Sequence, residues 1–296
     1  MAMKIAYYPG CTLKTKAKNF EDSALAAASA LGVEFEELEM WNCCGTVYSL
    51  ADDDLIHQIA SIRNLIRVRD KGENKVVTLC SMCYNTMKRA NLFIQTDELK
   101  HRRINTYMDN EKPYNGEVKV YHFLELLRDE IGLDEVRFKT KKPLSGLKVA
   151  PYYGCLLVRP PEVGLDDLEN PTVIENVFTQ MGAEVIDDPL KTECCGSYQT
   201  VNMPEFVADL SYKILNSAKS RGADVVVTSC PLCQFNLDRR QRDIIKKRLD
   251  FAPIPVMYFT QLMAMAFDLP ADVYGLDSHF VDPKPLLRKK GFIELA

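Results

Sequence analysis

The stretch VVTLCSMC, residues 76–83, decides the fold, because a β-branched run leads directly into two cysteines and then into a helical pattern. It recurs as VVTSCPLC at residues 226–233. Working outward from each copy, a Cys-Cys-Gly step precedes it, as NCCGT at 42–46 and as ECCGS at 193–197. The same two-part signature therefore occurs once in each half of the chain.

All ten cysteines of the 296-residue chain belong to two sets of five with the order C, CC, CxxC. The first set is Cys11, Cys43, Cys44, Cys80 and Cys83, and the second set is Cys155, Cys194, Cys195, Cys230 and Cys233. The gaps between the three motifs are 31 and 35 residues in the first set and 38 and 34 in the second. YYPGC at 7–11 matches PYYGC at 151–155. We interpret the chain as a tandem duplication, with domains at residues 1–142 and 143–296.

Short apolar runs alternate with helical patterns in both halves. We expect strands at 4–8, 33–38, 75–79 and 223–229, and helices at 19–32, 52–72 and 81–94. Asn170 and Pro171 indicate an N-cap and a first-turn proline for a helix of the second half. The predicted fold is α/β, with two tandem, duplicated Rossmann-like domains whose parallel sheets are related by a pseudo-twofold axis.

This fold places the cysteines at one edge of each sheet. Cys11, Cys80, Cys155 and Cys230 follow strands, and the carboxyl ends of parallel strands form the binding crevice of an open sheet. Adjacent cysteines on an extended strand point to opposite faces, so both reach one centre only where the backbone turns. Gly45 and Gly196 allow that turn because glycine adopts positive φ.

Composition restricts the class of protein. Hydrophobic residues make up 47% and charged residues 26%, which is typical of a packed globular protein. The formal net charge of -4 gives no reason to expect nucleic acid as a partner. No signal peptide and no run suited to membrane insertion is evident, and VMYFTQLMAMAF at 256–267 is better interpreted as a strand followed by a buried helix. We predict a cytoplasmic protein.

Ten cysteines in a reducing compartment indicate metal binding or redox chemistry rather than five disulfides. Structural zinc usually takes four ligands in two separated pairs, which five thiols fit poorly. A dithiol-exchange enzyme uses one CxxC and leaves three cysteines idle. Iron–sulfur ligation suits an all-thiolate site, although a conventional cubane leaves one thiol surplus in each set.

The doubled ten-cysteine pattern resembles the CCG, or cysteine-rich, domain that occurs twice in the B subunit of heterodisulfide reductase. The resemblance covers the whole chain, including the tail VYGLDSHFVDPKPLLRKKG. It implies two non-cubane [4Fe-4S] clusters, each ligated by all five cysteines of its set. It also implies a catalytic B subunit of a soluble complex, which reduces the mixed disulfide of coenzyme M and coenzyme B to the two thiols. The implied electron donors are the C and A subunits of heterodisulfide reductase, with a hydrogenase or formate dehydrogenase upstream. The chain itself carries no ferredoxin-type cubane motif and no nucleotide motif.

Further site residues are expected around the cysteines. Lys14 and Arg159 follow a ligand on strand-end loops and are the preferred candidates for binding an anionic substrate; Lys88, Arg89, Arg239 and Arg240 are weaker ones. His122 and His279 are candidate general acids. Tyr8 and Tyr153 are expected to donate to sulfur or to shield a cluster from water. The working hypothesis is homolytic cleavage of a disulfide between two clusters that face one crevice.

Other interpretations remain open. The same double motif occurs in iron–sulfur subunits of lactate-, glycolate- and succinate-type oxidoreductases, where the chain would only transfer electrons. A reductase of a different disulfide in a non-methanogen and a structural zinc protein are the remaining alternatives. A spectral change induced by substrate separates the disulfide enzyme from the electron-transfer protein.

Overall fold

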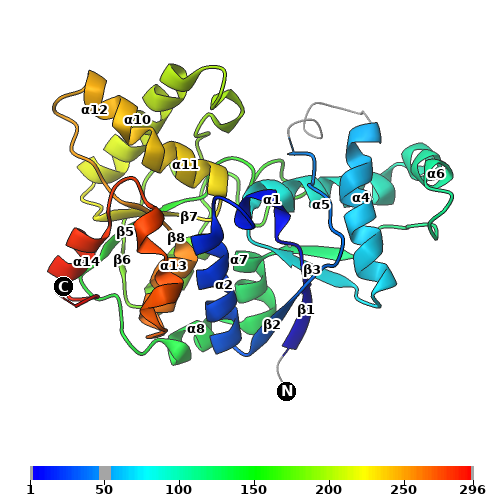
Figure 1. Ribbon diagram of the computed structural model, residues 1–296, viewed down its shortest axis with the longest axis horizontal. Helices are drawn as coiled ribbons and strands as arrows, with labels where there is room; N and C mark the ends of the chain where they lie inside the picture. Colours follow the sequence, from blue (N-terminus) through cyan, green and yellow to red (C-terminus); the bar gives the residue numbers. More distant parts are fainter. Residues whose placement is uncertain (1–2, 47–54, 295–296) are drawn as a thin grey trace.

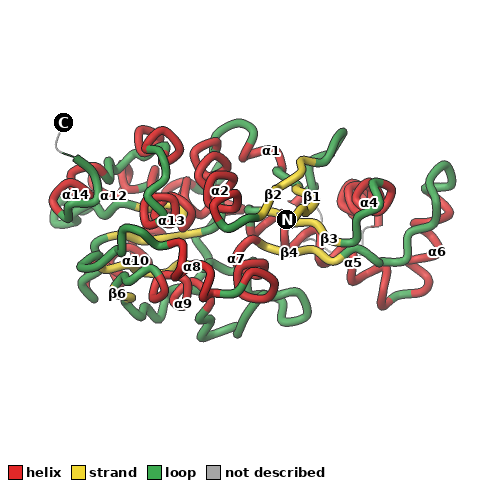
Figure 2. The backbone as a smooth tube through the Cα atoms, turned by 90° about the horizontal axis from the view of Figure 1, so that it is seen from below, coloured by secondary structure: helices red, strands yellow, loops and turns green. Residues whose placement is uncertain are grey.

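A computed structural model describes residues 3–46 and 55–294. Two four-stranded parallel sheets form the two halves, and helices cover both faces of each sheet (Figures 1 and 2). The duplicated α/β fold predicted from the sequence is confirmed.

The first sheet has the strand order β2-β1-β3-β4. Its strands are β1 (Met3–Tyr7), β2 (Val33–Glu37), β3 (Lys75–Thr78) and β4 (Lys119–His122). Its helices are α1 (Gly10–Leu13), α2 (Lys18–Ala30), α4 (Leu55–Asp70), α5 (Ser81–Thr96), α6 (Glu98–Tyr107), α7 (Phe123–Leu126), the π-helix η1 (Leu127–Ile131) and α8 (Leu133–Lys139). The helix expected at 52–72 is thus present as α4, and residues 52–54 lie outside the described part of the chain.

The second sheet repeats this order as β6-β5-β7-β8. Its strands are β5 (Lys148–Tyr152), β6 (Glu184–Val185), β7 (Val225–Thr228) and β8 (Val256–Tyr258). Its helices are α9 (Val173–Gln180), the 3-10 turn η2 (Ser197–Gln199), α10 (Pro204–Ser220), α11 (Pro231–Arg239), α12 (Gln241–Lys247), α13 (Phe259–Ala266), the 3-10 turns η3 (Ala271–Tyr274) and η4 (Leu276–Ser278), and α14 (Lys284–Lys289). The strand and buried helix expected at 256–267 are β8 and α13, and every residue of α13 is buried.

The central strands are apolar on both faces because helices cover both faces. All four residues of β7 are buried, and in β3 only Lys75 is partly exposed. Parallel sheets buried on two sides require such continuous β-branched runs instead of alternating ones. The sequence VVT therefore specifies the middle strand of each sheet.

The two halves exchange equivalent helix contacts. Helix α2 of the first half packs against α13 of the second, side by side in Figures 1 and 2. The Phe20 and Tyr258 rings stack with centroids 4.2 Å apart, and Ser23 Oγ lies 2.7 Å from Thr260 Oγ1. Helix α9, the counterpart of α2, contacts α7, the counterpart of α13. This reciprocal packing is the pseudo-twofold arrangement expected from the duplication.

The start of α9 differs from its prediction. The helix begins at Val173, after Thr172 in the N-cap position, so Asn170 is not the cap. The Asp166 carboxylate accepts hydrogen bonds from the backbone N–H groups of Thr172 (2.7 Å) and Val173 (3.0 Å). A carboxylate from an earlier loop thus satisfies the helix N-terminus, and the Asn170 side chain accepts from Lys191 Nζ instead.

Strand β4 ends at His122 and β5 begins at Lys148, while the domain boundary between residues 142 and 143 stays a prediction. Within residues 3–46 and 55–294, no helix combines the length and the hydrophobicity needed to cross a membrane.

Candidate metal centres

The first set of thiols gathers at the carboxyl edge of the first sheet. Cys11 lies on α1 after β1, the Cys43–Cys44 pair follows β2, and Cys80 and Cys83 frame the start of α5. The Cys11 and Cys43 sulfurs are 3.9 Å apart, and the Cys44 and Cys83 sulfurs are 3.6 Å apart. Cys11 and Cys43 are exposed, and the other three are buried. Three loops that are distant in sequence thus deliver five sulfurs to one place.

The second set has the same arrangement but is better covered. The sulfurs of Cys195 and Cys233 are 3.5 Å apart, and the Gly196 N–H donates to Cys194 Sγ at 3.3 Å. A hydrogen bond from the Cys155 thiol lowers the pKa of Cys194 to about 6, and the same bond raises the pKa of Cys155. One thiolate of that pair is therefore stabilised near neutral pH. All ten cysteines are free thiols.

Glycines shape both sites. Gly45 and Gly196 adopt φ of 75° and 79°, so the turn expected after each cysteine pair is confirmed. Gly10 and Gly154 occupy matching positions one residue before Cys11 and Cys155. A Cβ at Gly10 would lie 3.0 Å from Cys83 Sγ, and one at Gly154 would lie 3.2 Å from Cys233 Sγ. In both halves the backbone at this glycine lies so close to the second CxxC sulfur that a larger residue would crowd the sulfur.

Matching tyrosines hold the cysteine pairs in place. Tyr8 Oη donates to the carbonyl of Asn42, and Tyr152 Oη donates to the carbonyl of Glu193, both at 2.7 Å. Each acceptor directly precedes a Cys-Cys pair. Tyr8 and Tyr153 were predicted to donate to sulfur or to shield a cluster, but the Tyr8 hydroxyl donates to the Asn42 carbonyl and the Tyr153 hydroxyl donates to the Glu175 carboxylate. The alignment of YYPGC with PYYGC on the cysteine identifies Tyr152 as the partner of Tyr8.

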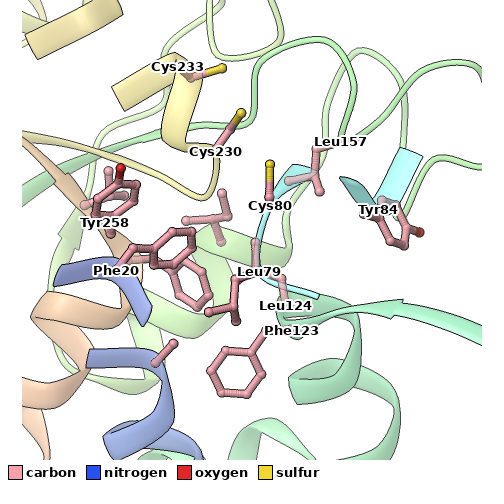
Figure 3. Packing of buried hydrophobic residues seen from close by; sticks show 14 of the residues in the cluster. Phe20, Leu79, Cys80, Tyr84, Phe123, Leu124, Leu157, Cys230, Cys233 and Tyr258 are labelled. Carbon is pink, nitrogen blue, oxygen red and sulfur yellow. The ribbon is translucent and has the colours of Figure 1, made fainter. Parts of the chain in front are cut away.

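The two sets adjoin each other where the halves meet. Cys80 and Cys230, each the N-cap residue of its helix, face one another across the contact between the halves (Figure 3). The hydrogen bond that Cys80 donates to Cys230 raises the pKa of Cys80, and hydrogen bonds from Cys233 and Cys80 lower the pKa of Cys230. The neighbouring Ser81 and Ser229 hydroxyl oxygens are 3.0 Å apart. The positive ends of the α5 and α11 helix dipoles therefore both lie at the Cys80 and Cys230 sulfurs.

A cavity of about 900 Å³ opens onto the first set. All five of its cysteines line the cavity, and residues of α11, α12 and β8 from the second half complete the wall. Among the described lining residues there is no cysteine of the second set. Both halves thus build one cavity, but the cavity differs from the expected crevice, which both sets would have faced.

Four cations line the cavity: Lys16, Arg239, Arg240 and Arg242. Its described lining includes no aspartate or glutamate. Arg240 donates to the Thr200 carbonyl and pairs with Asp243 at 3.2 Å, which fixes its guanidinium at the wall. Arg239 and Arg240 were weak candidates from the sequence. Lys16 and Arg242 were missed, although each lies within two residues of a candidate.

The preferred candidates lie elsewhere. Lys14 Nζ pairs with the buried Glu21 at 2.7 Å and also with Glu37, and Lys14 does not line the cavity. Arg159 donates to the Thr192 carbonyl and pairs with Glu169, both at 2.9 Å, beside the second set. These contacts explain both side chains structurally, and a role for either in substrate binding stays a prediction.

The two candidate histidines differ in position. His122 is fully buried; its Nε2 lies 2.8 Å from the Leu79 carbonyl and its Nδ1 accepts from the Leu124 N–H at 3.1 Å. Burial lowers the pKa of His122 to about 4. It is therefore neutral and caps α7. His279 Nδ1 lies 3.4 Å from the amide of Gln234, which lines the cavity, so only His279 adjoins it.

The donor set fits an iron–sulfur cofactor. Each set brings together five free thiols, and in each half a glycine lets the backbone approach a CxxC sulfur closely. Thiolate sulfur is the usual ligand of iron–sulfur clusters. Among the described residues, no three His, Cys, Asp or Glu side chains converge on a position for one metal ion.

Comparison with known proteins agrees with the duplicated site. The chain matches the family described as Cysteine-rich domain, CCG, over residues 5–88 and again over residues 149–238. These two segments contain all ten cysteines.

Curated relatives match over nearly the full length. The chain is 33% identical to the 8-methylmenaquinol:fumarate reductase membrane anchor subunit of Wolinella succinogenes, over 97% of this chain and 100% of that protein. It is 27% identical to the B subunit of the ferredoxin/F420H2-dependent CoB-CoM heterodisulfide reductase of Methanosarcina acetivorans, over 97% and 96% of the two chains. A protein of Archaeoglobus profundus that is described as like the heterodisulfide reductase B subunit is 29% identical over 93% and 94%.

A solved structure shares the fold. A hypothetical protein from Helicobacter pylori superposes with a TM-score of 0.76 at 12% identity. The match covers 94% of this chain and 51% of that protein, so this chain spans about half its length. At this identity the likeness concerns the fold alone.

Proposed function

The chain belongs to the CCG, or cysteine-rich, domain family, and from this premise we propose that it is the disulfide-reducing component of a heterodisulfide reductase-type complex. Its relatives include several heterodisulfide reductase B subunits, so an oxidoreductase component with iron–sulfur sites is supported. The observation that carries the proposal is the cavity, because it exposes the first set of thiols to small molecules and surrounds them with cations.

We propose that each set of five cysteines holds one non-cubane [4Fe-4S] cluster. The five thiols per set, the glycine approach at Gly10 and Gly154 and the tyrosine bonds that fix each cysteine pair support this assignment. When bound, the clusters supply single electrons to the substrate disulfide. Two electrons and two protons convert one disulfide into two thiols.

The protein groups around the cavity bind and orient the substrate. Lys16 and the three arginines of the wall favour a substrate with an anionic group, because charge-assisted hydrogen bonds to sulfonate, phosphate or carboxylate are strong. The apolar lining residues Met82, Leu232 and Phe235 exclude water from the sulfur atoms. His279 is the proposed proton donor, because its Nδ1 lies 3.4 Å from Gln234 at the cavity wall. His122 is not assigned this role because it is fully buried and does not line the cavity.

The specific substrate and partners are part of the proposal. We assign the mixed disulfide of coenzyme M and coenzyme B, whose two halves carry sulfonate, phosphate and carboxylate groups that suit the cations. The proposed partners are the C and A subunits of heterodisulfide reductase, with a hydrogenase or formate dehydrogenase upstream. Location in the cytoplasm stays a prediction.

The test begins with the anaerobically purified protein. Iron and acid-labile sulfide are counted per chain, and electron paramagnetic resonance spectra are recorded before and after adding coenzyme M thiol under oxidising conditions. We expect about eight irons and a new thiol-dependent signal. The neutral thiol 2-mercaptoethanol, at the same concentration, is the matched control and should give a weaker signal. About four irons would remove the two-cluster assignment, and iron without any thiol response would remove the disulfide chemistry.

One observation favours a second function. The relative at 33% identity is named as the membrane anchor subunit of an 8-methylmenaquinol:fumarate reductase. The chain would then be an iron–sulfur electron-transfer component of another oxidoreductase, and the clusters would be redox-active without binding thiols. Full iron content, a redox-active spectrum and no change with coenzyme M thiol support this alternative.

A further inference from the structure

The second set of cysteines approaches the surface beneath an exposed apolar patch. Tyr198, Val201, Met203, Phe206 and Phe235 form this patch, and their exposed fractions are 39%, 87%, 51%, 47% and 41%. Residues 201–206 are all exposed, and they follow the Cys194-Cys195-Gly196 step after one 3-10 turn. Large exposed apolar side chains that gather in one place mark interaction surfaces.

Contacts show that the patch is continuous. The Arg240 guanidinium lies 5.9 Å from the Phe235 ring centroid and donates to the Thr200 carbonyl, next to Val201. Thr200 Oγ1 donates to Asn236 Oδ1 at 2.8 Å. These bonds hold the start of α10 against α11, so Phe235 and the 198–206 segment share one face.

The patch lies directly over the second set. Tyr198 lies in η2, which directly follows the Cys194-Cys195-Gly196 step. Asn236 Nδ2 lies 3.2 Å from the Cys195 carbonyl and 3.5 Å from its sulfur. A molecule seated on the patch therefore lies close to the second set, and it adjoins the cavity of the first set, because Phe235 belongs to both.

The rim of the patch is basic although the whole chain carries a net charge of -4. Arg240, Arg242, Lys246 and Lys247 line a shallow depression between α10 and α12 together with Glu205 and Asp243. Cations thus outnumber carboxylates around an apolar centre, which complements an acidic partner protein with an apolar contact area.

We propose that this patch is the docking surface of an acidic one-electron carrier protein, which delivers electrons to the second set. The proposal rests on the iron–sulfur assignment above and adds the place of entry. Each encounter oxidises the carrier by one electron and reduces the chain by one electron, so two encounters supply one disulfide cleavage. Cys80 and Cys230, which face each other where the halves meet, connect the entry side to the cavity side.

The test measures reduction of the iron-loaded chain by a chemically reduced bacterial ferredoxin in a stopped-flow instrument. The wild-type rate should saturate with ferredoxin concentration and fall as salt is added. Val201→Asp and Met203→Asp should each lower the second-order rate by about tenfold. Phe138→Asp is the matched control, since Phe138 is 71% exposed on α8 at the opposite edge of the molecule (Figure 1). Reduction by dithionite and the iron content should not change in any variant.

Three results would overturn the proposal. They are equal ferredoxin rates in wild type, Val201→Asp and Phe138→Asp; a wild-type chain that accepts no electrons from ferredoxin; and binding to phosphatidylserine vesicles that Val201→Asp abolishes, which would assign the patch to a lipid surface. Failure of the disulfide function is recognised separately, because it removes the thiol-dependent resonance signal of the wild type and leaves the ferredoxin rates as they are.

Discussion

Replacing Gly10 by alanine should empty one metal centre and leave the other intact. The change has two costs that can be separated. Gly10 has a φ of 72°, and a left-handed conformation costs an alanine about 1–2 kcal/mol. Its Cβ would also lie 3.0 Å from Cys83 Sγ, whereas an ordinary contact needs about 3.5–4.0 Å. The sulfur must then move by roughly 0.5–1 Å, which exceeds the ~0.2 Å tolerance of a metal–ligand bond.

Gly32→Ala isolates the backbone cost. Gly32 has a φ of 77°, but a Cβ there meets nothing within 4 Å. Gly32→Ala should therefore lose about 1–2 kcal/mol in urea unfolding of the iron-free chain, and Gly10→Ala should lose more because its Cβ also meets Cys83 Sγ. Only Gly10→Ala should fall from about eight to about four irons per chain after reconstitution. Gly154→Ala is the equivalent change in the second half, with its Cβ 3.2 Å from Cys233 Sγ. Full iron in Gly10→Ala would refute the assignment of Cys83 as a ligand.

Three further predictions use the same protein. Lys14→Met removes the nearer cation from the buried Glu21, which keeps the more distant Lys18 and the Tyr7 hydroxyl, so the free energy of unfolding should drop by about 2 kcal/mol, while coenzyme M thiol should bind as in wild type; weaker binding would support a role of Lys14 in substrate binding. Burial lowers the pKa of His122 to about 4, so on acidification the unfolded state binds a proton at this imidazole before the folded state does. The contribution of neutral His122 to the free energy of unfolding should be complete above pH 6.5 and decline by about 3 kcal/mol toward pH 4. His122→Asn should remove this part of the pH dependence, as urea unfolding at several pH values would show. Arg239→Gln should weaken the response to coenzyme M thiol several-fold and leave the response to 2-mercaptoethanol unchanged, as titrations by paramagnetic resonance would show.

The local structure around the cysteines was predictable because short-range chemistry specifies it. A β-branched run that ends in cysteine and continues into helix formers has one compatible arrangement in a parallel sheet. Gly45 and Gly196 had to adopt positive φ for adjacent cysteines to serve one centre, and both do. Because the chain is duplicated, the same prediction applied to the second half.

The position of Lys14 was not predictable from its distance to Cys11. Helix α1 ends at Leu13, and the direction of the chain beyond it depends on α2, which carries the buried Glu21. Lys14 consequently turns toward Glu21, and Lys16 lines the cavity instead. The predicted N-cap of α9 was wrong for a similar reason. The Asp166 carboxylate accepts a hydrogen bond from the Thr172 N–H, and no local sequence pattern connects these two residues.

The asymmetry of the cavity arises from positions where the two halves differ. When the CxxC motifs are aligned, Arg240 corresponds to Ala90 and Arg242 to Leu92. His122 corresponds to Tyr258: His122 is buried and bonded to the backbone, but Tyr258 stacks on Phe20 and lines the cavity. The duplication therefore retained the thiols and changed the wall around them. The three arginines of the wall come from the second half and Lys16 comes from the first, so under the proposed function the two sulfurs of a substrate disulfide would occupy different environments. An unsymmetrical disulfide is the substrate that such a cavity orients in one direction.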